Sequence, residues 1–440
     1  MLQLNYIREN KDEVLKRLSI KNFKDAETII NAVLAKDVER RNIQKESDNI
    51  KAESNQIAKQ IGELMKTGKK EEAEKVKLKT AELKVSEKQF DEQLKKLEDE
   101  IHALLVQVPN APNLSVPIGK TPEQNEVVSE NGAKPTLHAK AVPHWELTTK
   151  FNLIDFELGV KIAGAGFPVY KGKGAKLQRA LINYFLDKAT AAGYNEIQPP
   201  ILVNEDSGYG TGQLPDKEGQ MYHMQIDNLY LIPTAEVPVT NIYRDVIVKE
   251  SDFPIKNTAY TPCFRREAGS YGKDVRGLNR LHQFDKVEIV QIVHPDNSYA
   301  ILEEMKDYVA GILKELELPF RVLKLCGGDM SFASALTYDL EVWSAAQQRW
   351  LEVSSVSNFE SFQTNRLKCR FKDATGKTQL AHSLNGSALA LPRIVAALLE
   401  NNQTETGIKI PKVLVPYCGF YYSLLLTHFY HPFAKLSIVN

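Results

Sequence analysis

Apolar residues near the N-terminus recur with heptad spacing. From residue 73 to residue 104 they alternate by three and four positions, and only Thr80 and Glu87 interrupt a seam of Ala73, Val76, Leu83, Phe90, Leu94, Leu97, Ile101 and Leu104. A second seam upstream runs through Ile43, Ile50, Ile57 and Leu64. Residues 66–70 (KTGKK) separate the two seams as a turn. The pattern predicts two long helices, and so short a turn makes them antiparallel.

The hydrophobic pattern changes beyond residue 108. Residues 109–132 are rich in Pro, Asn and Ser, which is typical of a linker. After them, short β-branched and aromatic runs alternate with helical stretches, as in a mixed domain. We therefore divide the chain into a helical domain at 1–108, a linker at 109–135, a mixed domain at 136–420 and an apolar tail at 421–440. Residues such as His428 and Pro432 interrupt the tail too often for a membrane span.

Composition narrows the class of protein. Lys and Arg together number 56, and so do Asp and Glu, so the formal net charge is zero. This balance excludes histone-like and polybasic membrane-binding proteins, but it allows a local basic patch. The four cysteines lie far apart without a CxxC pair, so we expect buried thiols and no structural zinc. Neither a signal peptide nor an apolar run of ~20 residues is visible, so we expect a cytoplasmic protein that does not enter membranes.

Lysines gather around the turn between the two predicted helices. Lys66, Lys69, Lys70 and Lys75 lie there, and acidic residues at 71, 72 and 74 interleave with them. One interpretation is a spacer or dimerisation coiled coil, which this segment alone favours. The other is an arm whose lysines bind an elongated polyanion.

The first candidate site segment follows an apolar run at 229–231. On an extended chain, Thr234 and Glu236 project to the same side and suit a small zwitterion, with the carboxylate binding an ammonium group. A helix start capped by Thr234 explains the same residues equally well.

The second candidate segment is basic. The stretches 264–267 (FRRE) and 276–288 flank a loop that contains Gly269 and Gly272, and the pattern predicts a strand for each stretch. Arg265 offers a planar fork for phosphate, and Glu267 on the same face can accept from an exocyclic amine. Phe284 can stack on a base. A charged β-hairpin without a ligand is the alternative.

Two later segments add further polar groups. Alternation along 350–359 places Glu352 and Ser354 on one face, where a carboxylate and hydroxyls can hold Mg²⁺ together with substrate phosphates. In 382–393, a tight turn at Gly386 is expected to open a helix that carries Arg393 two turns in, an arrangement that suits an anion. A capped core helix is the alternative there.

The ordered set of motifs resembles the class II aminoacyl-tRNA synthetases, and among them the seryl-tRNA synthetase family. The motifs are GYNEIQPP at 193–200, TAE at 234–236, FRRE at 264–267 and NGSALALPR at 385–393, and the resemblance extends over residues 1 to about 420. It implies an α+β fold in which helices flank an antiparallel sheet, preceded by an antiparallel two-helix coiled-coil arm. It also implies that 1–108 binds tRNA and that 136–420 is catalytic. The tail departs from the family and is assigned no role.

The resemblance implies a role for particular residues. Arg265, on the α-phosphate, and Arg393, near the γ-phosphate, would be the catalytic pair. The remaining ATP-binding residues would be Arg266, Glu267, Leu281, Phe284, Glu352, Val353, Ser354 and Ser355, and two of these, Glu352 and Ser355, would hold Mg²⁺. Serine would be bound by Thr234, Ala235, Glu236, Glu288 and Ser387. Pro200 would lie at a homodimer interface. Ala388 and Pro392 stand where the family often has glycine, and we expect them to shift the geometry only slightly.

The implied activity is the ATP-dependent attachment of L-serine to tRNA(Ser) through a seryl-adenylate, with tRNA(Sec) as a second acceptor left open. The lysines at the turn would then contact the long variable arm of the tRNA. Two alternatives stay open: a related enzyme that charges another acceptor, and a coiled-coil structural protein with an inactive catalytic-like domain.

Overall fold

The computed structural model describes residues 1–216, 218–267 and 276–420. The chain forms two compact units, Met1–Leu114 and Ser115 onward. The apolar tail at 421–440 and the loop glycines Gly269 and Gly272 lie outside the described residues.

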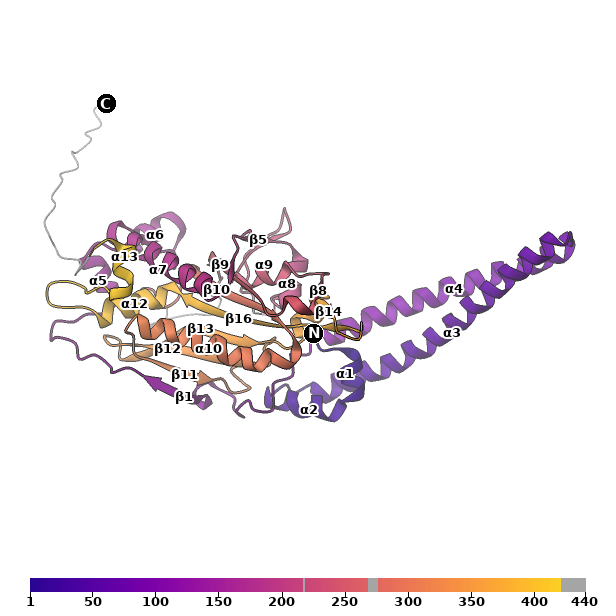
Figure 1. Ribbon diagram of the computed structural model, residues 1–440, viewed down its shortest axis with the longest axis horizontal. Helices are drawn as coiled ribbons and strands as arrows, with labels where there is room; N and C mark the ends of the chain where they lie inside the picture. Colours follow the sequence, from indigo (N-terminus) through magenta and orange to yellow (C-terminus); the bar gives the residue numbers. More distant parts are fainter. Residues whose placement is uncertain (217, 268–275, 421–440) are drawn as a thin grey trace, which may run out of the picture. The chain divides into compact units, whose positions relative to one another are not determined.

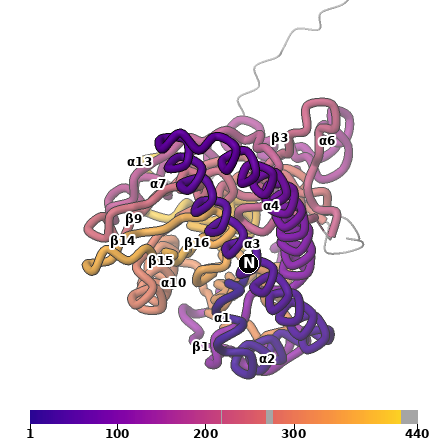
Figure 2. Tube along the Cα trace, turned by 90° about the vertical axis from the view of Figure 1, so that its right-hand side faces the viewer, coloured from indigo at the N-terminus to yellow at the C-terminus, as the bar shows by residue number. Residues whose placement is uncertain are grey.

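The first unit is entirely helical. It consists of α1 (Leu4–Glu9), α2 (Lys11–Ile20), α3 (Ala26–Lys66) and α4 (Lys70–Leu105). Figure 1 shows the two long helices running back along one another, and in Figure 2 they are seen as neighbouring tubes with the turn toward the viewer. Every residue of the two predicted seams is buried or half-buried. The predicted antiparallel two-helix arm is confirmed.

Ion pairs connect the two helices of the arm. Lys51 Nζ lies 3.0 Å from Asp91 Oδ1, and Lys79 Nζ lies 2.6 Å from Glu53 Oε1. Because all four side chains are about half exposed, water screens both ion pairs, and neither adds much to the stability of the arm. The apolar seam therefore supplies most of the stability of the arm.

A buried carboxylate holds the base of the arm. Asp37 on α3 contacts Arg8 of α1 at 3.1 Å, together with Arg40 and Arg41 of its own helix. Burial alone would raise the pKa of Asp37, but the hydrogen bonds from Arg40 and Arg8 outweigh it and lower the pKa below its usual range. This cluster belongs to the base and does not depend on the distal part of the hairpin.

The second unit is built on an eight-stranded sheet of order β1-β11-β12-β13-β16-β10-β9-β4. Its strands are β1 (Glu126–Asn131), β4 (Asn195–Glu196), β9 (Ile255–Phe264), β10 (Gln283–Val293), β11 (Phe320–Lys324), β12 (Leu336–Ser344), β13 (Arg349–Asn358) and β16 (His382–Ala390). All neighbours are antiparallel except β4 and β9. The predicted α+β fold with an antiparallel sheet is therefore confirmed.

Helices and small sheets surround this central sheet (Figure 1). The helices are α5 (His144–Lys150), α6 (Phe156–Ala163), α7 (Gly172–Ala191), α8 (Glu205–Thr211), α9 (Glu236–Asn241), α10 (Ser298–Glu315), α11 (Phe362–Leu367), α12 (Leu391–Asn401) and α13 (Val415–Cys418). The short strands are β2 (Ile154–Asp155), β3 (Val169–Tyr170), β5 (Leu202–Val203), β6 (His223–Met224), β7 (Leu229–Leu231), β8 (Ile247–Lys249), β14 (Arg370–Lys372) and β15 (Thr378–Leu380). Of these helices, α7, α9, α10, α11 and α12 pack directly on the central strands.

The structure corrects two predictions about local structure. Gly386 does not form a turn. It lies inside β16, opposite Ile289 of β10 and Val356 of β13. A Cβ atom at Gly386 would lie 3.1 Å from Val356 Cγ2, so close strand packing explains the glycine. The helix begins only at Leu391, which puts Arg393 in its first turn. Residues 276–282 are also not a strand, because β10 starts at Gln283.

Candidate active site

Thr234 and Ala235 directly precede α9 and Glu236 is its first residue, so the prediction of an extended segment is wrong. Ala235 has helical backbone angles, and the Glu236 amide donates a 3.2 Å hydrogen bond to Thr234 Oγ1. This local bond stabilises the helix start, the alternative that the sequence left open. Both side chains are nevertheless buried, at 5% and 6% exposure, and both enter the same polar cluster.

That cluster joins α9 to two central strands. Glu288 on β10 lies directly opposite Ser387 on β16, whose hydroxyl donates to Glu288 Oε2 at 3.4 Å. Lys286 Nζ lies 2.6 Å from Glu288 Oε2 and donates to Thr234 Oγ1 at 2.7 Å. The structure thus brings Thr234, Glu288 and Ser387 together, as predicted for a single pocket.

Lys286 is a site residue that sequence reasoning missed. It precedes Glu288 by two positions on β10 and therefore lies on the same face of the strand. The spacing of these two oppositely charged residues, followed by the apolar pair Ile289 and Val290, was the available signal.

The cluster contains buried carboxylates and therefore favours the binding of a cation. Gln363 Nε2 donates to Glu236 Oε1 at 2.6 Å. Burial, and next the charge of Glu288, raise the pKa of Glu236 to about 7. The two carboxyl groups of Glu236 and Glu288 thus share one ammonium group, that of Lys286. A ligand that brings a second ammonium group would complete the charge balance.

Arg265 lies just beyond the end of β9, where the chain contacts the residues that precede β10. Its amide donates to the His282 carbonyl at 2.9 Å, and its guanidinium lies 5.3 Å from the ring centre of Phe284. Leu281 is buried, and Arg266 is exposed. The structure therefore brings Arg265 and Phe284 together, in agreement with the sequence prediction.

Glu267 does not share a strand face with Arg265, contrary to prediction. β9 has already ended at Phe264, and Glu267 adopts a left-handed conformation with φ of 48°. Its carboxylate accepts a 2.8 Å hydrogen bond from Arg280 Nη1. The backbone turn at Glu267 redirects the side chain, which no alternation pattern could indicate.

A β-bulge in β13 changes which of its residues share a face. Glu341 pairs with Glu352 and Leu340 pairs with Ser354, so Val353 is the extra residue. Glu352 and Ser354 are consequently not on one face, and the prediction is wrong for this pair. Val353 and Ser354 are buried, and the Ser354 hydroxyl donates to the Ser387 carbonyl.

The same bulge places Glu352 and Ser355 together. Ser355 pairs with Asp339, and Asp339 and Glu341 are two residues apart on β12, so all four side chains lie on one face. Burial, and next the charge of Glu352, raise the pKa of Asp339 well above its ordinary value. Asp339 is a second residue that the sequence analysis missed.

Arg393, in the first turn of α12, contacts this acidic group. Its Nη1 donates to the Glu352 carbonyl at 2.8 Å and lies 3.5 Å from Glu352 Oε2, while its Nε donates to the Asn279 carbonyl at 3.1 Å. Ala388 is fully buried in β16. Pro392 is accommodated in the first turn of the helix, where a missing amide hydrogen costs little.

The other predicted residues lie outside this cluster. Pro200 is exposed between β4 and β5, and the four turn lysines belong to the helical unit. Among the described side chains, no group of three or more His, Cys, Asp and Glu residues is arranged to hold a metal ion. Along the part of the chain that the structure describes, no helix has the length and apolar character needed to cross a membrane.

Comparison with known proteins agrees with this geometry. Residues 222–402 match the tRNA synthetase class II core domain (G, H, P, S and T), and residues 1–112 match the seryl-tRNA synthetase N-terminal domain. The chain is 49% identical to the serine–tRNA ligase of Salinibacter ruber over 422 residues, which cover 96% of this chain and 98% of the relative. The chain belongs to the seryl-tRNA synthetase family.

Other members of the seryl-tRNA synthetase family match over similar lengths. The serine–tRNA ligase of Chlorobium luteolum is 46% identical, with 96% of this chain and 98% of that protein covered. The crystal structure of seryl-tRNA synthetase from Pyrococcus horikoshii complexed with ATP superposes with a TM-score of 0.89 at 31% identity, covering 97% of this chain and 99% of that one. The resemblance inferred from the motifs is confirmed.

Proposed function

We propose that the chain activates L-serine with ATP and transfers the seryl group to tRNA(Ser). One observation carries the proposal: Phe284, Lys286 and Glu288 alternate along β10 and so lie on one face of the sheet. The arginine–aromatic pair at Phe284 suits a nucleotide, and the buried carboxylates around Glu288 suit an amino acid. A single strand thus holds both substrates side by side.

The first chemical step joins these substrates. A carboxylate oxygen of serine attacks the α-phosphorus, the bond to the bridging oxygen breaks, and pyrophosphate leaves. Arg265 would stabilise the charge on the α-phosphate, and Arg393 would hold the far end of ATP. The side chains thus contribute positioning and charge stabilisation rather than a covalent nucleophile. In the second step, a terminal ribose hydroxyl of tRNA attacks the seryl carbonyl and releases AMP.

The residues near Arg393 also fit a Mg²⁺ ion bound with ATP. Glu352 and Ser355 lie on one face with Asp339, whose Oδ1 atom is buried and has no hydrogen-bond partner among the described residues. Mg²⁺ is commonly held by one or two carboxylates plus substrate phosphates and water, which agrees with so small a donor set. Bound there, Mg²⁺ would neutralise phosphate charge.

Serine binding is expected to depend on pH through Glu236. Below its pKa of about 7 the free carboxyl is neutral, and above it the carboxylate attracts the serine ammonium group. The kcat/KM for serine should therefore fall as the pH drops through 7, by about tenfold per unit well below the pKa. Exchange assays between pH 5.5 and 8.5 on the wild type and on Glu236→Gln would measure this dependence. A flat wild-type profile, or the same inflection in Glu236→Gln, would contradict the assignment.

The function itself is tested by amino acid-dependent exchange of pyrophosphate into ATP. Serine should stimulate exchange, and alanine should be at least about 10⁴-fold less effective, because the hydroxyl-binding groups would be left unpaired. Charging of total tRNA, and of tRNA(Ser) and tRNA(Sec) transcripts, would then identify the acceptors. Exchange with serine but no charged tRNA would favour an enzyme with a different acceptor. No exchange with any amino acid would favour the inactive structural protein.

We further propose that the enzyme acts in the cytoplasm as a homodimer. An open groove follows α7 and is lined by Gln178, Arg179 and Ile182 together with residues 196–198, close in sequence to the exposed Pro200. This mixture of apolar and polar side chains suits an interface with a second copy. Sedimentation should show a species of about twice the 49.6 kDa chain mass, and a monomer at micromolar concentration would refute the dimer.

A further inference from the structure

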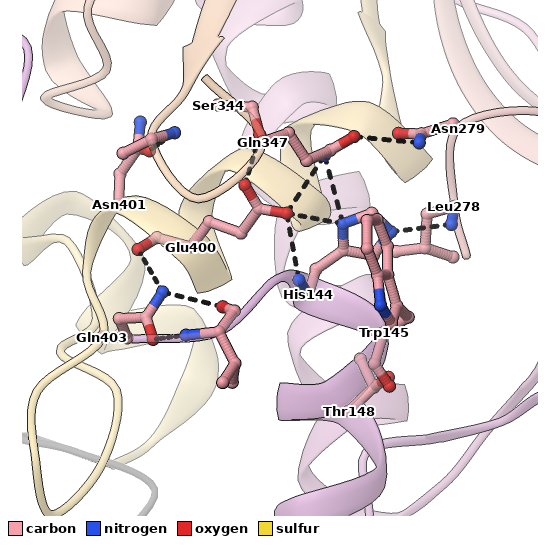
Figure 3. Close-up of polar contacts among 12 residues, drawn as sticks. His144, Trp145, Thr148, Leu278, Asn279, Ser344, Gln347, Glu400, Asn401 and Gln403 are labelled. Carbon is pink, nitrogen blue, oxygen red and sulfur yellow. Dashed lines mark hydrogen bonds and ion pairs between the residues drawn. The ribbon is translucent and has the colours of Figure 1, made fainter. Parts of the chain in front are cut away.

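A fully buried histidine lies beside the candidate ATP site, and the function proposed above does not use it. His144 is the first residue of α5 and is 0% exposed. Its Nδ1 lies 2.7 Å from Glu400 Oε1, and its Nε2 accepts a 2.9 Å hydrogen bond from the Leu278 amide (Figure 3). Because Nε2 accepts, the proton of the neutral ring is on Nδ1 and is donated to Glu400.

Glu400 is a buried carboxylate surrounded by donors. Besides the imidazole, it accepts from the His144 amide at 3.0 Å, from Gln347 Nε2 at 3.0 Å and from the Ser344 hydroxyl. Burial alone would raise the pKa of Glu400, but these bonds, those of His144 first, lower it below its ordinary value. So many donors give the carboxylate one fixed position.

These hydrogen bonds, together with the Leu278–Asn279 backbone, form a closed ring that also contacts Arg393. Gln347 connects Glu400 to Asn279, whose Nδ2 donates to Gln347 Oε1 at 3.0 Å. The Asn279 carbonyl in turn accepts from Arg393 Nε. Asn279 directly follows Leu278, the residue whose amide His144 holds. The ring therefore holds the Leu278–Asn279 backbone in place, and the Asn279 carbonyl orients the Arg393 guanidinium.

The packing around Gly277 supports a close and specific contact. Gly277 has a φ of 65°, and a Cβ atom built on it would lie 2.3 Å from His144 Nε2. Only glycine allows the chain to pass this close to the imidazole in that conformation.

We propose that His144 and Glu400 are positioning residues for ATP, which act by holding the Leu278–Asn279 backbone and through it Arg393. The inference rests on the proposed role of Arg393 in binding ATP. Neither residue touches the reacting atoms. Their loss should displace Arg393 while the buried cluster around Glu288 keeps its own contacts.

The main variants are His144→Phe and His144→Gln, with Thr148→Val as the matched control. Phenylalanine keeps a ring but loses both polar atoms, so kcat/KM for ATP in serine-dependent exchange should fall by about 10²-fold, mostly through KM. Glutamine keeps one donor and one acceptor and should restore part of this loss. Thr148 is also on α5 and 0% exposed. Among the described residues its hydroxyl hydrogen-bonds only the Trp145 carbonyl, at 3.1 Å, so Thr148→Val should leave the ATP KM unchanged.

A purely structural role makes a different prediction. His144→Phe would then unfold at a lower temperature, but the folded fraction would show the wild-type ATP KM, and this outcome would overturn the inference. If His144→Phe does not fold, Gly277→Ala replaces it, since its Cβ displaces the same backbone while His144 and Glu400 remain. An unchanged ATP KM in folded Gly277→Ala would equally refute the proposal. Absence of serine-dependent exchange in the wild type would instead refute the proposed function.

Discussion

Replacing Arg265 with alanine is expected to reduce serine-dependent exchange of pyrophosphate into ATP by about 10³-fold, because the α-phosphate loses the cation that would stabilise its developing charge. The fold should survive. The Arg265 amide, which the substitution keeps, makes the 2.9 Å bond to the His282 carbonyl, and the contact of its side chain within the described part of the chain is the stacking on Phe284. Initial rates at saturating ATP and serine, together with a melting temperature, would separate lost catalysis from lost structure.

Two companion variants sharpen the Arg265 test. Arg265→Lys keeps the charge but not the planar fork, so its rate should lie between those of the wild type and the alanine variant. Arg370→Ala removes a side chain on β14 whose one hydrogen bond to the described residues is to the Lys368 carbonyl at 3.2 Å, and this variant should exchange normally. Near-normal exchange in Arg265→Ala would remove Arg265 from the catalytic site.

The helical arm was predictable because its signal is local. A seam such as Leu83, Phe90 and Leu97 repeats every seven residues, and the turn at 66–70 separates it from the upstream seam. The period of a helix and the residues that form a turn depend on positions close together in the sequence, so the sequence alone is enough to predict the arm. The structure agrees along both helices and at the turn.

Most residues of the candidate site could be named from the sequence, but their arrangement in space could not. The bulge at Val353 depends on the register between β12 and β13, and the left-handed turn at Glu267 depends on how β9 meets the residues before β10. These are contacts between distant segments, and period-two alternation cannot anticipate them. For the same reason no sequence pattern indicates the pairing between His144 and Glu400, which are 256 positions apart.

The arm supplies the second prediction with a large effect. Removing residues 43–94 and joining the ends with a Gly-Ser linker of about four residues would span the ~8–10 Å between the helix axes. The Asp37 cluster at the base stays intact. Exchange should remain within about twofold of the wild type, while kcat/KM for tRNA(Ser) charging should fall by at least about 10²-fold through lost phosphate contacts. Charging at the wild-type rate would show that the arm is a spacer.

Charge changes at the turn would separate tRNA binding from a purely mechanical role. Replacing Lys66, Lys69, Lys70 and Lys75 with alanine should raise the KM for tRNA and flatten its dependence on salt, because fewer phosphates are neutralised. Glu71→Gln with Glu72→Gln should lower the same KM, since Glu72 lies 3.2 Å from Lys69 Nζ and offsets its charge. Both variants keep the helices and their apolar seam. A KM for tRNA that rises in the first variant and falls in the second would show that the charged turn contacts the tRNA. If the arm were only a spacer, neither variant would change this KM.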